Sequence, residues 1–279
     1  MPHVPSGISA ALSSMVILAT GAAGQSVQDI VDDMYAAYER QAQGIDDYTL
    51  VQTAMGIETL SYFEKEMVEG RPIFRLRSSG TNGVSFGLGG EDTGQGDVYL
   101  FGPQMVEHGR YAGRDQIDGN PVHVIAVDDA SQLDMEPPSG GDMEFTARTL
   151  RLFIDAELSV PRRMEFVGDA RTPDGVQELT MRMDLTDIRD VRGMLIPHRT
   201  LVQIEGMEAM IDPEMQAQLA EMERQLAAMP ADQRQMMERM LGPQMEQIRA
   251  MMGGAASGGG MNIEVTVSDV RVNTGPPRE

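Results

Sequence analysis

The sequence predicts one mainly β domain, a curved antiparallel half barrel with an N-terminal helix and a helical lid. Short segments in which apolar and polar residues alternate run from residue 48 to residue 204 and again from 262 to 272. Gly, Pro and Asp separate these segments. Before them, at residues 25–45, apolar residues recur every three or four positions, as on one face of a helix. Because the connections between these strands do not suit a parallel crossover helix, each strand is expected to pair with its sequence neighbour.

The composition excludes several classes of protein. Of 279 residues, 22 are Lys or Arg and 43 are Asp or Glu, and the net charge of −21 would repel a nucleic-acid backbone. The chain has no Cys, which removes disulfides, thiolate metal sites, a cysteine nucleophile and a cysteine lipid anchor. Aromatic residues make up 5% and Trp is absent, so aliphatic side chains and methionine must build the core. We expect a soluble mature protein without a cofactor.

The first 24 residues resemble a secretory signal. They carry no charged side chain, and an apolar run from Ile8 to Ala19 is followed by small residues up to Gly24. The run is shorter than the ~20 residues that span a bilayer, so export with cleavage is favoured over anchoring. A disordered apolar tail is the alternative. The sequence therefore predicts a periplasmic protein whose domain spans residues 25–279.

The first element of this domain is an amphipathic helix, followed by a long series of strands. The apolar stripe of the helix consists of Val27, Ile30, Val31, Met34, Tyr38 and Ala42. The predicted strands are 48–55, 58–67, 72–77, 98–101, 111–117, 122–127, 146–155, 162–167, 176–188, 194–204 and 262–272. A sheet of about eleven strands curls towards a barrel, and the helix would plug the curl.

Two segments interrupt the strands. Residues 78–96 are rich in glycine and predict a mobile surface loop. Residues 207–260 form a methionine-rich helical insert with a glycine-rich return, in which Asp212 is the predicted N-cap and Pro230 forces a restart. Its apolar seam has heptad spacing and consists of Met215, Leu219, Met222, Leu226, Met229, Met236 and Met240. This seam fits core packing, a lid over acyl chains, or thioether coordination of Cu(I).

Four motifs, in this order, resemble the LolA-like proteins, the periplasmic carrier superfamily that includes outer-membrane lipoprotein-sorting proteins. They are Arg-Pro-Ile-Phe-Arg at 71–75, Leu-Phe-Ile-Asp at 152–155 with Val-Pro at 160–161, Asp-Val-Arg-Gly-Met-Leu-Ile-Pro-His-Arg at 190–199, and Val-Arg-Val-Asn at 270–273. The resemblance implies an unclosed antiparallel barrel of about eleven strands with an apolar cavity for acyl chains. It also implies transport of a lipid or of lipoprotein acyl chains between inner- and outer-membrane transport components.

The resemblance further implies which residues act. In the lipoprotein carrier an arginine directly before a proline in an early strand ties the lid shut, and Arg71 before Pro72 matches that position. We expect Arg71 to hydrogen-bond lid carbonyls in the closed state. Phe74 and the seven seam residues are the other candidate ligand-binding or lid-gating residues. The alternative function is a non-enzymatic module that docks an envelope protein or senses envelope stress.

Other motifs point to no chemistry. Gly83–Gly87 fits the nucleophile elbow of serine hydrolases, but the glycine-rich residues that follow cannot form the helix that the elbow needs, so no enzyme is predicted. The three histidines of the mature chain stand alone, without the spacing of a metal site, and only His198 could face a ligand at the rim. They are His108, His123 and His198.

Carboxylates concentrate between the sixth and seventh strands of the predicted sheet, at residues 128–142. The loop lacks the regular alternation and the glycine of a calcium loop, so solvated charge is favoured over weak calcium binding. The residues are Asp128, Asp129, Asp134, Glu136 and Asp142.

Overall fold

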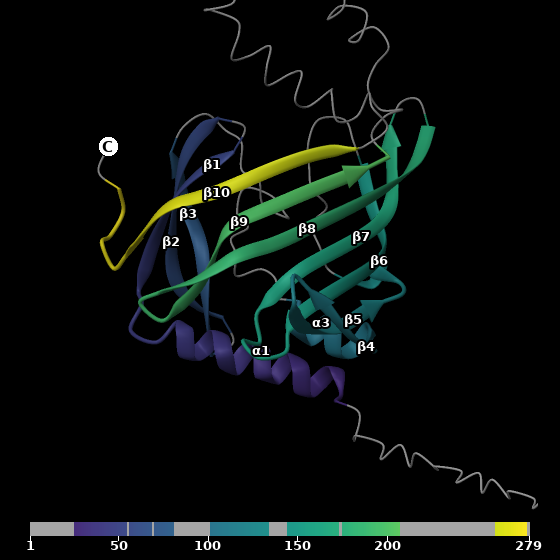
Figure 1. Ribbon diagram of the computed structural model, residues 1–279, viewed down its shortest axis with the longest axis horizontal. Coiled ribbons are helices and arrows are strands. Elements are labelled where there is room, and N and C mark those ends of the chain that lie inside the picture. Colours follow the sequence, from purple (N-terminus) through teal and green to yellow (C-terminus); the bar gives the residue numbers. More distant parts are fainter. Residues whose placement is uncertain are drawn as a thin grey trace, which may run out of the picture.

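The computed structural model describes residues 25–54, 56–68, 70–80, 101–133, 144–172, 175–206 and 260–277, and confirms the mainly β fold. Ten antiparallel strands form one sheet in the order β3-β2-β1-β10-β9-β8-β7-β6-β5-β4 (Figure 1). The elements are α1 Val27–Gln41, β1 Asp47–Ala54, β2 Ile57–Val68, β3 Arg71–Gly80, α3 Gly102–His108, β4 Gly109–Ile117, β5 Asn120–Val127, η1 Ala130–Gln132, β6 Glu144–Asp155, β7 Pro161–Thr172, β8 Gly175–Val191, β9 Met194–Glu205 and β10 Met261–Val272.

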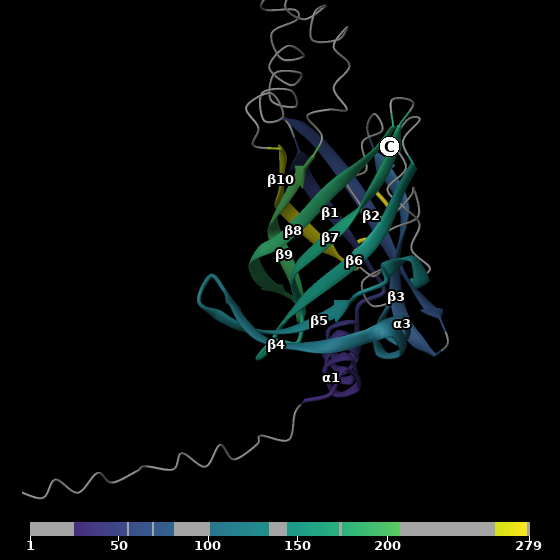
Figure 2. The same ribbon diagram turned by 90° about the vertical axis from the view of Figure 1, so that its right-hand side faces the viewer.

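The pairing of strands follows the predicted meander with one break. Every strand from β4 to β10 pairs with its neighbour in sequence, as do β1, β2 and β3. In the described part of the chain β3 and β4 do not pair and form the two edges, while β10 returns to pair with β1. The sheet curls strongly, and α1 crosses beneath it from the β1–β3 side to α3 and β4 (Figures 1 and 2). The barrel is thus open between β3 and β4.

Helix α1 forms as the sequence predicts. Ser26 caps it through a capping box, in which the Asp29 amide donates to Ser26 Oγ at 3.1 Å and the Ser26 amide donates to Asp29 Oδ2 at 3.0 Å. These hydrogen bonds from Ser26 lower the pKa of Asp29. The predicted stripe faces the sheet, and its buried members are Ile30, Val31, Met34, Tyr38 and Ala42. Burial of this face fixes α1 against the sheet.

The core lies between α1 and one face of the sheet, which we call the inner face. Side chains alternate between the two faces of a strand, and directly paired residues share a face. Met164 of β7 pairs with Leu152 of β6 and Met183 of β8, so all three lie on the inner face. The main core cluster joins them to Ile30 and Met34 of α1.

The hairpin between β4 and β5 turns where the sequence predicts. Asp118 and Gly119 both have positive φ, 49° and 84°, as a two-residue type I′ turn requires. A second hairpin, between β8 and β9, turns in the same way at Arg192 and Gly193, with φ of 55° and 92°. These tight turns fix the register on either side.

One predicted strand is wrong at its described end. Phe101, the last residue of the predicted strand 98–101, has helical dihedrals (φ −79°, ψ −7°) and is the N-cap of α3. Pro103 in the first turn favours the start of a helix there, and a helix of seven residues is too short to show a period. The described residues therefore contain ten strands where about eleven are expected. Residues 1–24, the glycine-rich loop at 81–96 and the insert at 207–259 lie outside the described residues.

Candidate functional site

Part of the inner face is apolar and only partly covered. Met183 of β8 pairs with Met164 and with Val202 of β9, and Met181 pairs with Phe166 and Ile204. Met181 and Met183 are half-buried, although their partners Met164 and Phe166 are 5% and 6% exposed. Four different strands, β3, β6, β8 and β10, each contribute half-buried apolar side chains that pack against the main core. This half-buried stripe consists of Leu76, Ala147, Met181, Met183 and Val267.

A second part of the inner face is polar. Gln52 of β1 pairs with Thr59 of β2 and with Val267 of β10, so it adjoins the half-buried stripe. Its Nε2 donates to Ser61 Oγ at 3.1 Å. Ser61 and Thr59 are buried, with 4% and 9% of their surface exposed. We call Gln52, Thr59 and Ser61 the polar ladder.

Helix α1 bridges the two open edges of the sheet through Tyr35. The guanidinium of Arg71, at the start of β3, lies 3.9 Å from the centroid of the Tyr35 ring. The same ring packs on Gly102 of α3, where an added Cβ would lie 2.2 Å from the Tyr35 hydroxyl oxygen. Burial raises the pKa of Tyr35, and the charge of Arg71 opposes that shift. Arg71, Tyr35 and Gly102 thus join β3, α1 and α3.

Phe74 lies in an aromatic cluster against α1. Its ring meets the rings of Tyr38 and Tyr48 edge-on, at 6.3 and 5.1 Å between centroids, and Tyr48 stacks on Phe63 at 4.7 Å. The Phe74 amide donates to the Tyr38 hydroxyl at 3.3 Å, which satisfies a backbone group on the edge strand β3. Phe74 is 2% exposed. We call Tyr38, Tyr48, Phe63 and Phe74 the aromatic floor.

Of the nine candidate site residues that the sequence predicts, only Arg71 and Phe74 lie in the described part of the chain. Both are near α1, Arg71 on Tyr35 and Phe74 in the aromatic floor. The other seven lie outside the described residues: Met215, Leu219, Met222, Leu226, Met229, Met236 and Met240. Their roles stay predictions, as does the contact of Arg71 with a lid.

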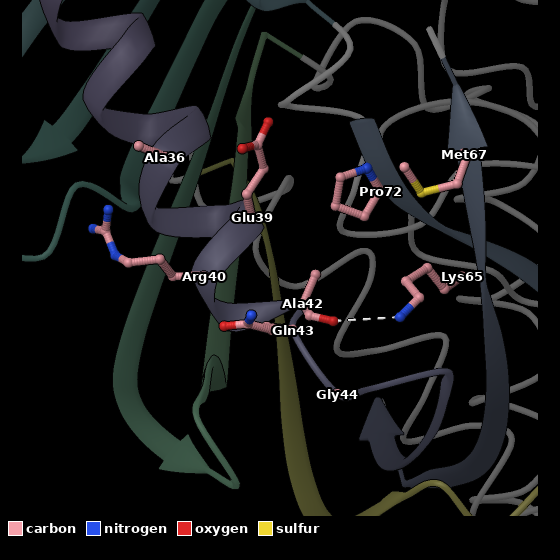
Figure 3. A pocket seen from close by; sticks show the side chains of 9 residues that line it. All are labelled: Ala36, Glu39, Arg40, Ala42, Gln43, Gly44, Lys65, Met67 and Pro72. Carbon is pink, nitrogen blue, oxygen red and sulfur yellow. Dashed lines mark hydrogen bonds between the residues drawn. The ribbon is translucent and has the colours of Figure 1, made fainter. Parts of the chain in front are cut away.

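A groove of about 590 Å³ lies between the C-terminal part of α1 and the β2–β3 hairpin (Figure 3). Lys65 Nζ donates to the Ala42 carbonyl at 3.5 Å and lies 3.2 Å from the Asp46 carboxylate, so this cation already has two partners. Met67, which lies on the same β2 wall as Lys65, is 61% exposed. The lining is Ala36, Glu39, Arg40, Ala42, Gln43, Gly44, Lys65, Met67 and Pro72, and none of these belongs to the half-buried stripe.

The histidines do not meet one another. His123 is buried on β5, and its Nδ1 lies 3.3 Å from the Tyr111 hydroxyl. Burial lowers the pKa of His123. His198 is buried on β9, with Nδ1 3.1 Å from the Ile196 carbonyl, and His108 ends α3. Among the described residues no three His, Asp or Glu side chains gather where they could hold a metal ion.

The described carboxylates of the acidic loop have protein partners. Asp128 accepts two hydrogen bonds from Arg110, at 2.7 and 3.0 Å, which lower its pKa. Asp129 accepts from Ser131 and Gln132, and these hydrogen bonds lower its pKa as well. Asp134, Glu136 and Asp142 lie outside the described residues, as does the Gly83–Gly87 motif.

Sequence reasoning missed Tyr35 and the polar ladder. Tyr35 lies beside Met34 and outside the narrow apolar stripe, so its burial follows only from the bridge between β3 and α3. A signal for the ladder was present: Thr59 and Ser61 alternate with the same period as the inward-facing Phe63 on one strand. Two small polar residues at inward positions of an otherwise apolar strand indicate a polar patch on the inner face.

No protein-family model matches the chain, and no curated protein matches its sequence. Solved structures do match. A proposed outer membrane lipoprotein-sorting protein domain from Vibrio parahaemolyticus is 12% identical, with 90% of this chain and 93% of that chain covered and a TM-score of 0.41. A DUF1329 family protein from Desulfovibrio piger is 10% identical (91% and 96% covered, TM-score 0.40). A LolA superfamily protein from Nitrosomonas europaea is 13% identical (91% and 96% covered, TM-score 0.33).

Two of these matches carry names of the superfamily that the motifs resemble. At such identities and TM-scores they carry no argument about cargo or partners. None of the described helices is long and apolar enough to cross a membrane. The chain is thus similar, at low identity, to solved structures that include a LolA superfamily protein.

Proposed function

We propose that the protein binds the acyl chains of a lipid or lipoprotein on its inner face and carries them through the periplasm. The half-buried stripe is the observation that carries this proposal. Aliphatic side chains from β3, β6, β8 and β10 line the inside of the curl and are incompletely covered. An apolar surface of this kind inside a curved sheet suits an apolar ligand.

The hydrophobic effect supplies the affinity. Each methylene group removed from water contributes about 0.8 kcal/mol, so an acyl chain of about fourteen methylenes costs about 11 kcal/mol to expose. A carrier that covers most of this chain makes its passage through water possible. Met181 and Met183 suit the task because the flexible thioether side chain adapts to chains of different shape.

The rest of the proposal concerns the residues around the stripe. Residues 1–24 act as a cleaved signal, and the insert at 207–260 covers bound chains with its methionine seam. The described residues on either side of the insert lie next to each other. Met261 pairs with Ile204, and an added Cβ on Gly260 would lie 2.5 Å from the Ile204 carbonyl oxygen. This supports an insert that leaves the sheet and returns to it at one place. Arg71 lies beside α1, whereas Ile204 and Met261 lie at the opposite ends of their strands, so Arg71 would meet the insert only where the insert folds back.

Lipid content tests the proposal directly. The full chain is exported to a bacterial periplasm, purified without detergent, and analysed by native mass spectrometry and organic extraction. We expect a co-purified acyl lipid. The double variant Met181→Gln/Met183→Gln should lose most of it and bind a fluorescent fatty-acid probe at least tenfold more weakly, because two polar amides replace apolar contacts.

Two control proteins separate binding from folding. Met181→Leu/Met183→Leu keeps the apolar surface and should keep the lipid. Val176→Gln changes an exposed residue on the outer face of the same strand and should have no effect on binding. If the natural chain carries no lipid and binds no acyl probe, the carrier function is wrong and the docking of a protein partner becomes the better interpretation.

A further inference from the structure

The polar ladder lies beside the half-buried stripe and inside the same curl. Thr59 faces Gln52 directly across β1 and β2, and Gln52 faces Val267 of the stripe across β1 and β10. An acyl chain whose polar end lies at Val267 would bring that end next to Gln52. The ladder breaks an otherwise apolar wall, since Leu50 and Phe63 on the same two strands belong to the main core.

The ladder has hydrogen-bonding capacity that the described protein does not use. The Thr59 hydroxyl is buried, and no hydrogen bond joins it to another described residue. Ser61 accepts from Gln52, which leaves the Ser61 O–H free to donate. The second N–H of the Gln52 side-chain amide also makes no hydrogen bond to a described residue. A buried hydroxyl without a partner costs free energy, so such a group in a binding region indicates a ligand acceptor.

The ladder carries no charge. In the described part of β1, β2 and β10, Lys65 is the charged residue on the inner face, four residues from Ser61 and about 13 Å along the strand. Its ammonium group is held by Asp46 and by the Ala42 carbonyl. A carboxylate or phosphate at the ladder would find no counter-charge on the described parts of these strands, whereas a neutral carbonyl oxygen offers only acceptors to the three available donors.

We propose that the polar ladder binds the ester carbonyl of an acylglycerol group, so that the carrier selects ester-linked acyl chains over chains without a carbonyl. This inference rests on the proposed function. Thr59 and Ser61 donate their hydroxyl hydrogens to the carbonyl oxygen, and Gln52 holds Ser61 in place from β1. The selection is expected to be threefold to tenfold, because a neutral hydrogen bond changes affinity by about that factor.

The test compares two neutral lipids of equal chain length that differ only in the carbonyl. 1-Palmitoylglycerol carries the ester and 1-O-hexadecylglycerol has the ether in its place. We measure the displacement of a fluorescent acyl probe from the full-length protein by each lipid, below their critical micelle concentrations. The natural protein should bind the ester threefold to tenfold more tightly than the ether.

Variants locate this preference. Thr59→Val replaces the hydroxyl with a methyl group of the same shape, and Ser61→Ala removes the second donor. Each should lower the ester-to-ether ratio towards one and leave ether binding unchanged. Thr266→Val is the matched control, because Thr266 is exposed on the outer face of β10. A ratio of one in the natural protein, or a ratio that survives both ladder variants, overturns the inference while leaving acyl binding in place.

The same pair of experiments distinguishes the inference from the proposed function and identifies the source of the ester. If neither lipid displaces the probe and a diacylated lipopeptide also fails, acyl binding itself is wrong. A diacylglyceryl-cysteine peptide and its dialkyl ether analogue form the second arm. An ester preference only in the peptide arm assigns the ladder to lipoproteins, and one in both arms assigns it to acylglycerols in general.

Discussion

The inner face has two apolar regions of different character, the aromatic floor against α1 and the half-buried stripe beside it. The floor is sealed: Tyr38, Tyr48, Phe63 and Phe74 are all less than 9% exposed and meet one another in defined ring geometries. The stripe is aliphatic and incompletely covered. An apolar surface that is completely packed stabilises the fold, whereas an apolar surface that stays partly uncovered can bind an apolar ligand.

Helix α1 explains why the floor is sealed although the barrel is open. Tyr35 and Tyr38 reach from the helix to the edge strand β3, one to Arg71 and the other to the Phe74 amide. On the other side α1 meets α3 through Tyr35 and Gly102. One helix thereby closes the gap that the strands leave between β3 and β4. Stability should therefore depend mainly on the floor, and binding mainly on the stripe.

The largest effect is expected in the aromatic floor. Phe74→Ala should lower the free energy of unfolding by about 3 to 5 kcal/mol, because it removes a fully buried ring and leaves a cavity. Urea unfolding followed by circular dichroism measures the loss. Leu158→Ala, at a turn residue that is 39% exposed, should cost less than about 1 kcal/mol. A small loss for Phe74→Ala, with acyl binding abolished, would show that the floor is part of the ligand site.

The contact between α1 and α3 should show the next effect. Gly102→Ala brings a Cβ into the Tyr35 ring and should lower the free energy of unfolding by about 1 to 3 kcal/mol. Tyr35→Leu removes the ring, so the double variant should be more stable than the sum of the two single losses predicts. Strict additivity in this double-mutant cycle would mean that Tyr35 and Gly102 do not contact each other in solution.

The local elements of the fold could be predicted from the sequence, because their signals are local. The alternation of apolar and polar residues predicts most strands, and the helical spacing of Ile30, Met34 and Tyr38 predicts α1. The return of β10 to β1 was beyond such reasoning, since Val272 pairs with Tyr48 across almost the whole chain. The break between β3 and β4 likewise depends on α1 and α3, whose contact no local pattern contains.

The candidate site could be predicted only in part. The Arg-Pro pair at 71–72 predicts a contact of Arg71 with lid carbonyls, which stays a prediction, and the described partner of Arg71 is the Tyr35 ring. Phe74 was predicted from its place beside Arg71, and the structure puts it in the floor. The stripe and the ladder are properties of the curled sheet. The stripe includes Leu76, Met183 and Val267 from three strands that are far apart in the sequence, and each of them packs against the main core.

Truncation in the stripe should separate binding from stability. Leu76→Ala and Val267→Ala should each lower the free energy of unfolding by about 1 kcal/mol or less, because these side chains are only half-buried and leave little cavity. Each should weaken the binding of a fatty-acid probe about threefold to tenfold. A loss of stability as large as that of Phe74→Ala, with unchanged binding, would show that the stripe is ordinary core.

The smallest effect concerns pH and His123. Burial lowers the pKa of His123 below its usual 6.5, with Arg114 acting in the same direction and Asp33 of α1 opposing it. In the unfolded chain the imidazole therefore takes up a proton at a higher pH than in the folded protein. Stability from the neutral side chain is complete above about pH 6.5 and is lost as the pH falls from there towards the folded-state pKa.

His123→Gln tests this titration, because glutamine stays neutral throughout. The free energy of unfolding of the natural protein should fall between pH 7.5 and pH 5.5, and the variant should show a smaller fall. Val176→Gln, an exposed change that neither adds nor removes a titratable group, is the control and should keep the natural slope. Equal slopes for His123→Gln and the natural protein would place the titration elsewhere. Because His123 pairs with Ile154 of the main core, a confirmed effect would assign part of the loss of stability in acid to the β5–β6 side of the core.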